Sequence, residues 1–359
     1  MPSTSGMKGD GFYDANSSGQ RAAIEALLSW IDEAAERLAL PEVGRPLTIA
    51  DYGSSEGSNA LRAMRQAITA LRRRGAAHPI WAVFSDLSTN NFNQLFANLA
   101  GAKALPAAED GVFSAAIGGS FYESLLPPAT VQLAMSFNAV LWLDHLPAEP
   151  LENFVVYLGP RSHRADIRVP PTVAQAFARL AKGNLEQFLR CRAGELARGG
   201  RLLVSQPGSN QEYCTGEGLY DLVHDACLDL ISAGRLDRAA YAKVTMPIYF
   251  RTVEEMLAPV DDITGPLRDA FAVERAETQE VAVPFAVEYE QSGDLATYVK
   301  RYVGFAQAFT EPILRGVLDS AYGPELVPAI YERMKERLAA EPGRYAFRYL
   351  QTILLLAKR

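Results

Sequence analysis

The segment Ile49–Asn59 is the part of the sequence that most constrains the fold. A short apolar run ends in an acid, passes through a turn of small residues, and restarts as an amphipathic helix over 60–74. Glycines at 53 and 57 let the backbone approach a ligand where a Cβ would collide, and the first amides of the helix carry partial positive charge. The turn is neither GxGxxG, because position 55 is Ser, nor a P-loop, because the GK[ST] lysine is absent. The pattern therefore predicts a nucleotide cradle of another kind.

Composition and charge place the chain among globular proteins. Apolar residues make up 48% of the sequence and charged residues 21%, which is ordinary for a folded domain. The 359 residues suffice to bury a core without disulfides or metals. The formal charge of −7 argues against a nucleic-acid partner, because phosphate contacts require a basic face.

The cysteines, histidines and N-terminus carry no signal for metals, disulfides or export. The three cysteines lack CxxC spacing and the four histidines are scattered, so we expect no metal site and reduced thiols in the cytoplasm. The first eleven residues are polar, and no apolar run approaches membrane-spanning length. We therefore expect neither export nor a membrane partner.

Strand and helix patterns alternate along the chain, which predicts an α/β fold with a mostly parallel sheet and helices on both faces. The predicted strands are Leu47–Tyr52, Pro79–Ser85, Gly111–Ile117, Val131–Phe137, Arg201–Ser205, Phe271–Pro284 and Tyr345–Ala357. The predicted helices are Arg21–Leu38, Ala60–Arg74, Asn91–Leu99 and Glu186–Ala197, the last followed by a turn at Gly199-Gly200. The apolar run Ile353–Leu356 fits a helix equally well.

Three long intervals, mostly helical by pattern, are too large to be simple crossovers. We expect one unit over 1–359 with a sheet core at about 40–150, 184–210, 265–290 and 341–359, and a helical cap built from insertions at about 151–183, 211–264 and 291–340. Ligands in open α/β sheets bind outside the carboxyl ends of the strands, so such a cap would enclose a substrate.

Asp86 closes the second predicted strand. A carboxylate at this place can accept hydrogen bonds from both hydroxyls of a ribose. Alternatively, Asp86 is a turn or capping aspartate of the polar run 86–91. Because the glycine turn precedes it, we favour the ligand role for Asp86. This combination fits the first loop of a Rossmann-like class I methyltransferase, and the alternative is a strand-turn-helix of some other α/β protein.

The segment Ser85–Phe96 resembles the DLPxNDFNxLF motif of the SABATH family, the carboxyl methyltransferases of salicylate, benzoate, jasmonate and similar small acids. Further family signatures occur in the same order over nearly the whole chain: Met7–Gly9 with Tyr13–Gln20 for MKGG…YAxNSxxQ, Ala50–Asn59 for ADLGCSSGPN, Gly118–Tyr122 for PGSFY, Leu141–Pro147 for HWLSQVP, Phe188–Arg201 for FLxxRAxELVPGGRM, Met246–Tyr249 for IPxY, and Glu311-Pro312 for EP.

The resemblance implies S-adenosylmethionine as cofactor and S-adenosylhomocysteine as its product. The positions that fall where the family holds this cofactor are Tyr13, Ser17, Asp51, Gly53, Asn59, Asp86, Leu87, Ser120 and Phe121, with Asp86 on the ribose and Ser120-Phe121 beside the adenine. The positions that fall at the substrate are Gln20 and Trp142 on the carboxylate, with Leu141, Leu219, Tyr220 and Tyr349 around the body of the acid.

This arrangement is chemically coherent. A carboxylic acid with a pKa of about 4 is ionised at neutral pH, so its oxygen can attack a methyl sulfonium without a general base. The N–H groups of Gln20 and Trp142 are neutral donors that can orient the carboxylate. An arginine would bind it more tightly but would also stabilise the ground state that has to react.

Each of these residues also has an ordinary structural explanation. Taken alone, Trp142 would be a core residue and Gln20 a residue at a helix start. Ser120 and Asn59 would each cap a helix. His145 could serve as a base, but a histidine of an exposed loop is the better interpretation.

The chain departs from the family pattern at several positions. Leu141 stands where many members have His, Tyr52 replaces Leu, Asn91 replaces an acid, and Glu56-Gly57-Ser58 replaces Ser-Gly-Pro. We expect cofactor binding to survive these changes. Loss of the histidine makes the pocket mouth more apolar and bears on which acid is accepted.

We therefore expect a cytoplasmic O-methyltransferase that converts a small aromatic carboxylic acid into its methyl ester. Two alternatives remain: N-methylation of a small heterocycle, and a non-catalytic protein that binds the cofactor for regulation. A homodimer is expected only by analogy with the family.

Overall fold

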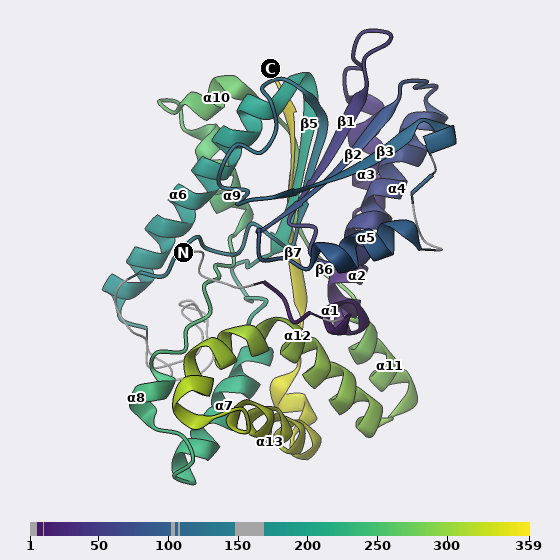
Figure 1. Ribbon diagram of the computed structural model, residues 1–359. Helices are drawn as coiled ribbons and strands as arrows, with labels where there is room; N and C mark the ends of the chain where they lie inside the picture. Colours follow the sequence, from purple (N-terminus) through teal and green to yellow (C-terminus); the bar gives the residue numbers. More distant parts are fainter. Residues whose placement is uncertain (1–5, 10, 102–104, 107, 148–168) are drawn as a thin grey trace.

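The computed structural model describes residues 6–9, 11–101, 105–106, 108–147 and 169–359. A seven-stranded sheet in the order β3-β2-β1-β4-β5-β7-β6 runs through the upper part of the molecule (Figure 1). The strands are β1 (Leu47–Tyr52), β2 (Ile80–Asp86), β3 (Val112–Gly118), β4 (Val131–Phe137), β5 (Leu196–Pro207), β6 (Phe271–Val281) and β7 (Tyr349–Lys358). The α/β fold predicted from the sequence is confirmed.

The first five strands of the sheet order are parallel, and β7 runs antiparallel to both of its neighbours, β5 and β6. The segment Ile353–Leu356 is a strand and not a helix, and its side chains are fully buried. A central strand covered on both faces reads as a continuous apolar run, which is why the sequence pattern was ambiguous there.

Alternate side chains of each strand serve two separate cores. In β1, Leu47 and Ile49 pack with the helices on one face, whereas Ala50 and Tyr52 pack with those on the other. The first face is covered by α3 (Leu28–Arg37), α4 (Ser58–Arg73) and α5 (Phe92–Ala100), the second by α6 (Pro171–Glu195), α9 (Val253–Asp261) and α10 (Pro266–Ala270) (Figure 1). Burial on both faces makes the sheet a rigid platform for the loops at its ends.

A helical layer lies beyond one end of the sheet (Figure 1). It consists of α7 (Leu219–Ser232), α8 (Arg238–Tyr241), α11 (Pro284–Ser292), α12 (Leu295–Tyr322) and α13 (Leu326–Ala340), with the short η2 (Pro342–Tyr345). Its core is rich in aromatic side chains, among them Phe285, Tyr298 and Tyr302. The short α1 (Phe12–Asn16) and α2 (Ser18–Glu25) lie between this layer and the sheet, and η1 (Ala108–Asp110) precedes β3.

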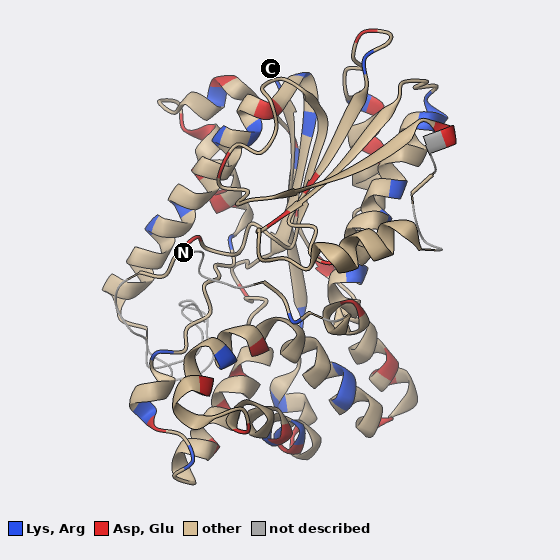
Figure 2. Ribbon diagram, in the orientation of Figure 1, with Lys and Arg blue, Asp and Glu red and all other residues tan. Residues whose placement is uncertain are grey.

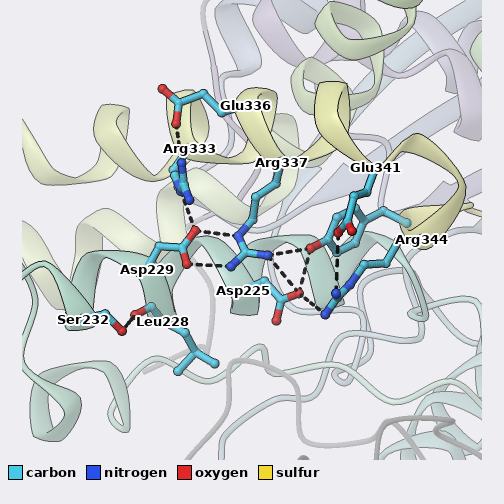
Figure 3. A network of polar contacts seen from close by, with 10 residues as sticks. Asp225, Leu228, Asp229, Ser232, Arg333, Glu336, Arg337, Glu341 and Arg344 are labelled. Atoms are coloured by element: carbon cyan, nitrogen blue, oxygen red, sulfur yellow. Dashed lines mark hydrogen bonds and ion pairs between the residues drawn. The ribbon is translucent and has the colours of Figure 1, made fainter.

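Ion pairs fasten α7 to α13 within the helical layer (Figure 3). Arg337 binds both oxygens of Asp229, at 2.6 Å from Nε and 2.6 Å from Nη2. Asp225 accepts from the Tyr345 hydroxyl at 2.8 Å and from Arg344 at 3.2 Å. Bidentate Arg–carboxylate pairs fix orientation as well as distance, so the two helices are held in one register.

Several local predictions differ from the structure. Two predicted strands are shorter at one end: Tyr345 belongs to η2 and β7 begins at Tyr349, while β6 ends at Val281 because Pro284 starts α11. The helix predicted over Arg21–Leu38 is two helices, α2 and α3, with a break at Ala26-Leu27 that keeps Ile24, Leu27 and Ile31 in the same core. The pattern could not reveal this break, because Ala and Leu are good helix formers.

The other two differences concern the connection from α6 to β5. Helix α6 begins at Pro171 rather than Glu186 and runs without interruption past Gly183, a position where glycine costs about 1 kcal/mol relative to alanine. The Gly199-Gly200 turn lies inside β5, where the register against β4 shifts and Gly199 has a φ of 76°. It is a strand irregularity rather than the turn that starts the strand.

Residues 148–168 lie outside the described residues, and they include 151–168, the start of the first cap segment predicted from the sequence. Since α6 crosses residue 183, that predicted boundary divides one helix, and the proposed division into core and cap stays a proposal. Basic and acidic residues are interspersed over the helices of both layers (Figure 2). Among the described helices, none combines the length and apolar character that crossing a bilayer requires.

Candidate active site

Chemistry-bearing side chains gather where β1, β2 and β4 end. Strand β1 lies between β2 and β4, so the chain leaves the sheet in opposite directions on its two sides, and ligands bind at such a switch point. Three adjoining cavities open there. We call them the large cavity, of about 660 Å³, the glycine-turn cavity, lined by the start of α4, and the aromatic cavity, lined by residues of the strand ends and of the helical layer.

The turn after β1 adopts a conformation that glycine permits. Gly53 and Gly57 have φ values of 95° and 98°, and Ser55 also has a positive φ, of 49°. A Cβ on Gly53 would lie 2.3 Å from the Cβ of Ala139. The turn is thereby pressed against the loop that follows β4, and both loops line the large cavity.

Asp86 bridges the end of β2 to the glycine turn. Its Oδ2 accepts from the Ser55 amide at 2.7 Å and its Oδ1 from the Leu87 amide at 2.8 Å. A carboxylate has about four acceptor positions, so two remain for hydroxyl groups in the large cavity that Asp86 lines. Helix α5 is capped by Asn91 and not by Asp86. A turn role for Asp86 therefore explains its bond to the Leu87 amide but not its bond to the Ser55 amide.

Burial perturbs both acids of the site. Desolvation and, to a lesser extent, the nearby charge of Asp86 together raise the pKa of Asp51 to about 7. Desolvation also raises the pKa of Asp86, opposed by the two amide bonds that it accepts. A buried carboxyl whose pKa is raised in this way ionises less readily at neutral pH. A cation bound beside it is favourable, because the opposite charge stabilises the ionised carboxylate.

The glycine-turn cavity is lined by Asp51, Gly53 and Asn59. Asn59 does not cap α4, as it would on local grounds, because the helix already begins at Ser58. Its Nδ2 instead donates to the Oγ of Ser17 at 3.1 Å, and Ser17 is fully buried. Ser17 and Asn59 thus link the N-terminal helices to this cavity.

Ser120 and Phe121 line the large cavity, as do Leu87 and the glycine turn. Ser120 does not cap a helix, since 121–125 are a turn followed by irregular structure; its Oγ accepts from the Tyr122 amide at 3.2 Å. Phe121 packs edge-on against Phe188 of α6, with ring centroids 5.8 Å apart. An apolar ring beside a hydroxyl matches the flat face and polar edge of a purine.

A buried ion pair holds this loop from behind. Arg192 donates to the carbonyls of Phe121 and Glu123 at 2.9 and 2.8 Å, and Glu195 accepts from the Leu125 amide at 2.6 Å. The hydroxyl of Tyr52 donates to Glu195 at 2.5 Å. Tyr52, which departs from the family pattern, therefore completes a hydrogen-bond network behind the loop. This network satisfies the buried charges of Arg192 and Glu195.

The aromatic cavity collects the residues that the resemblance assigned to the substrate: Gln20, Leu141, Trp142, Leu219, Tyr220 and Tyr349. Gln20 is buried within α2, and its Oε1 has no partner in the described part of the chain. Trp142 is half-buried and lines both the aromatic and the large cavity, so it is not an ordinary core residue. His145 is exposed and paired with Asp144 at 2.6 Å, as expected of a loop histidine.

Several lining residues were not anticipated from the sequence. The aromatic cavity also contains Met7, Asn138, Pro207, Thr215, Phe250, Phe305, Phe309 and Phe347. Phe305 and Phe309 stand four residues apart on α12, a spacing that could have suggested a shared helix face. Asn138 follows directly after β4, at a strand end where ligands bind, and this position was the available signal.

The described residues fit the implied cofactor. The large and glycine-turn cavities together offer an acid with free acceptor positions for a ribose, a ring and hydroxyl for a purine, and a buried carboxyl that favours a cation. Among the described residues no cluster of His, Cys, Asp or Glu has a geometry that could hold a metal ion.

Comparison with known proteins agrees with this geometry. The family model of the SAM dependent carboxyl methyltransferases matches residues 2–359. Gibberellic acid methyltransferase 1 of Arabidopsis thaliana is 27% identical over 94% of this chain and 92% of its own, and indole-3-acetate O-methyltransferase 1 of Oryza sativa subsp. japonica is 29% identical over 93% and 86%. A solved structure of loganic acid methyltransferase with SAH shares the fold, with a TM-score of 0.79 at 23% identity over 98% of both chains. The chain therefore belongs to the SAM-dependent carboxyl methyltransferases of the SABATH family, enzymes that use S-adenosylmethionine to convert the carboxylate of a small acid into its methyl ester.

Proposed function

We propose that the acceptor is a small aromatic acid, which lies in the aromatic cavity with its carboxylate between Gln20 and Trp142. The observation that carries this proposal is a buried side-chain amide and an indole in an apolar lining. Oε1 of Gln20 is buried without a hydrogen-bond partner among the described residues, Trp142 is half-buried in the same lining, and the described lining holds no charged side chain. The oxygen and nitrogen of a side-chain amide exchange places when the amide flips, so Gln20 can turn its N–H groups toward a carboxylate.

The shape of the lining supports an aromatic body. Tyr220 lies between Phe250 and Phe309, with ring centroids 6.1 and 6.3 Å away. Edge and tilted contacts of this kind accept another flat ring and contribute about 0.5–1.5 kcal/mol beyond the buried area. A second negative charge on the substrate would find no countercharge among these residues and would be expensive to desolvate.

Cofactor roles are assigned in the same proposal. Asp86 would hold the ribose hydroxyls, Ser120 and Phe121 the adenine with Leu87, and Tyr13, Ser17, Asp51, Gly53 and Asn59 the methionine part. S-adenosylmethionine supplies, when bound, an electrophilic methyl group on a sulfonium whose leaving group is a neutral thioether. Burial raises the pKa of Tyr13, so its hydroxyl stays neutral beside that cation.

No general base is needed in this scheme. The acceptor is ionised at neutral pH, and its oxygen lone pair forms the O–C bond while the electron pair of the S–C bond stays on sulfur, so no proton leaves. The protein's task is to align the oxygen, exclude water and avoid overstabilising the carboxylate. Neutral donors on Gln20 and Trp142 suit that task better than an arginine would.

A panel of acids tests the proposal. Purified protein is given S-adenosylmethionine with benzoate, salicylate, indole-3-acetate and aliphatic acids, and both S-adenosylhomocysteine and ester are quantified. We expect turnover on an aromatic acid, with a product that mild base cleaves. No turnover on any aromatic acid would contradict the proposed acceptor, and a base-stable product would indicate N-methylation, the activity suggested by relatives named as probable caffeine synthases, at 23 and 24% identity.

Two further expectations, on location and oligomeric state, belong to the same proposal: the protein is cytoplasmic, and it forms a homodimer. The three cysteines are buried thiols, as in a reducing compartment. Light scattering coupled to size exclusion measures the oligomeric state, and a monomer would contradict the second expectation.

A further inference from the structure

Asn138 lies where the large, glycine-turn and aromatic cavities meet. Only Asn138 and Tyr13 line all three cavities, among the described residues. The proposed function places the cofactor in the large and glycine-turn cavities and the acceptor in the aromatic one. A residue common to all three therefore stands where the transferred methyl passes from one to the other.

The backbone of Asn138 is held in a strained conformation. Its φ is 57°, in the left-handed region, and its amide donates to the Ser205 carbonyl at 2.9 Å. Asparagine tolerates this region better than other residues with a side chain, and glycine tolerates it best. Strain of this kind persists where the surrounding structure enforces it, often at functional sites.

The side chain of Asn138 is oriented by Tyr349. The Tyr349 hydroxyl donates to Oδ1 of Asn138 at 2.7 Å. Oδ1 is thereby engaged, and Nδ2, which carries both donors of the amide, has no partner among the described residues. Burial raises the pKa of Tyr349, so its hydroxyl keeps the proton that makes it a donor.

We propose that Asn138 is a third neutral donor of the site, with Nδ2 directed by Tyr349 at the acceptor carboxylate where cofactor and acceptor meet. This inference rests on the proposed function for the identity of the acceptor and for the placement of the cofactor in the large and glycine-turn cavities. With Gln20 and Trp142 it gives the carboxylate three uncharged donors from α2 and the loop after β4. This placement also means that a charge introduced at residue 138 would interact electrostatically with the sulfonium of the cofactor.

Two substitutions separate this role from the backbone explanation. Asn138→Gly keeps the left-handed conformation without strain and removes the amide. Asn138→Asp keeps the size and the tolerance of positive φ, but replaces the donor with a negative charge. If Asn138 serves only the backbone, Asn138→Gly behaves as the wild type in every assay.

The first measurement needs no acceptor. Dissociation constants for S-adenosylmethionine and S-adenosylhomocysteine are compared by calorimetry. Asn138→Asp should shift the ratio of the two affinities at least about fivefold toward the sulfonium, since the added charge attracts a cation and not a thioether. Asn138→Gly should leave the ratio within about twofold of the wild type. An unchanged ratio in Asn138→Asp would overturn the placement of residue 138 at the methyl group.

The second measurement reports the acceptor. Benzoate is titrated into protein saturated with S-adenosylhomocysteine. Asn138→Gly should weaken binding at least about fivefold and Asn138→Asp more, because one loses a donor and the other repels the anion. Wild-type affinity of Asn138→Gly would overturn the donor role.

Tyr349→Phe completes a double-mutant cycle. It keeps the ring and removes the hydroxyl that orients the amide, so it should weaken benzoate binding less than Asn138→Gly, and the two losses should not add. Additive losses would contradict orientation by Tyr349. Failure of the wild type to bind benzoate would count against the proposed acceptor, while the affinity ratio of the first measurement still decides the position of Asn138.

Discussion

A neutral donor and a charged donor act differently on a carboxylate that must react as a nucleophile. Both kinds of donor orient the carboxylate oxygen. A cation, however, stabilises the fully charged carboxylate of the ground state more than the transition state, in which the carboxylate is losing its charge. In the proposed site, the amide of Gln20 and the indole of Trp142, which both line the aromatic cavity, would orient the oxygen without this cost.

Removing these donors should affect the acceptor and not the cofactor. Gln20→Met and Trp142→Phe keep most of the volume, and each should lower kcat/KM for the acid by about tenfold or more, the effect of one hydrogen bond to a charged group. The dissociation constant of S-adenosylhomocysteine should stay within about twofold. Trp81→Phe, on an exposed position of β2, is the matched control. Equal loss of cofactor affinity would contradict the assigned roles.

The buried Asp51 gives the protein a pH-dependent stability. Its pKa in the folded state, about 7, lies above the unfolded value of 3.8, so its contribution is complete below about pH 4 and is lost as the pH rises through 7. Asp51→Asn should therefore gain about 3 kcal/mol in unfolding free energy relative to the wild type between pH 5 and pH 8, because the wild type loses about 1.4 kcal/mol for each pH unit from 5 to 7. Urea denaturation at both pH values measures this difference, and Asp261→Asn, at an exposed helix end, is the control. A parallel pH dependence of Asp51→Asn and the wild type would contradict the shift.

At the scale of elements, the site depends on how two loops meet. The turn after β1 and the loop after β4 touch at Gly53 and Ala139, and both line the large cavity. The Arg192–Glu195 pair of α6 holds a third loop in place through backbone carbonyls and amides. Rigid strands and helices thus set the positions of the loops that carry the chemistry.

Two glycines with similar backbones test the contact between the loops. Gly53 and Gly75 have φ values of 95° and 84°, but a Cβ would meet Ala139 at 2.3 Å only in the first case, and open space in the second. Gly75→Ala should cost about 1 kcal/mol through its backbone. Gly53→Ala should cost at least about 2 kcal/mol more, because the loops must separate, and cofactor affinity should fall with it. Denaturation and calorimetry of both variants check this, and equal costs would show that the contact adapts.

At the scale of the whole molecule, three parts of the chain enclose one site. The N-terminal segment contributes Tyr13 and Gln20, the sheet with the loop after β4 contributes Tyr349 and Asn138, and the helical layer contributes Phe305 with its neighbours. Lys8 binds Glu311 of α12 at 2.6 Å, which joins the N-terminal segment to the helical layer. Ligand binding should therefore stabilise the sheet and the helical layer together.

Thermal unfolding tests this coupling. S-adenosylhomocysteine at about 100 times its dissociation constant stabilises the folded state by about 2.7 kcal/mol, which corresponds to a rise in Tm of about 4 °C for a chain of this length. We expect one cooperative transition that shifts as a whole in calorimetry, and a loss of the shift in Asp86→Asn at the same ligand concentration. Two transitions, of which only one responds, would mean that the helical layer unfolds independently.

Local patterns were sufficient for much of the fold and part of the site. Strands β1 and β4 lie where the sequence predicts them, because an apolar run of that length bounded by turn residues has few alternatives. The glycine turn and Asp86 were recognisable for the same reason, since glycine at positive φ and an acid at a strand end are local requirements. The order of the motifs then identified the family over the whole chain.

Tertiary structure alone decided the break between α2 and α3, the full length of α6, and the wall of the aromatic cavity. Phe250, Phe305 and Phe347 come from segments far apart in sequence, and each would pass for an ordinary core residue by itself. The meeting of the three cavities at Asn138 likewise depends on how the strand ends converge and on Tyr349 of a distant strand. Sequence periodicity reports which side of an element is buried, but which distant side chains share that space is set by packing between elements.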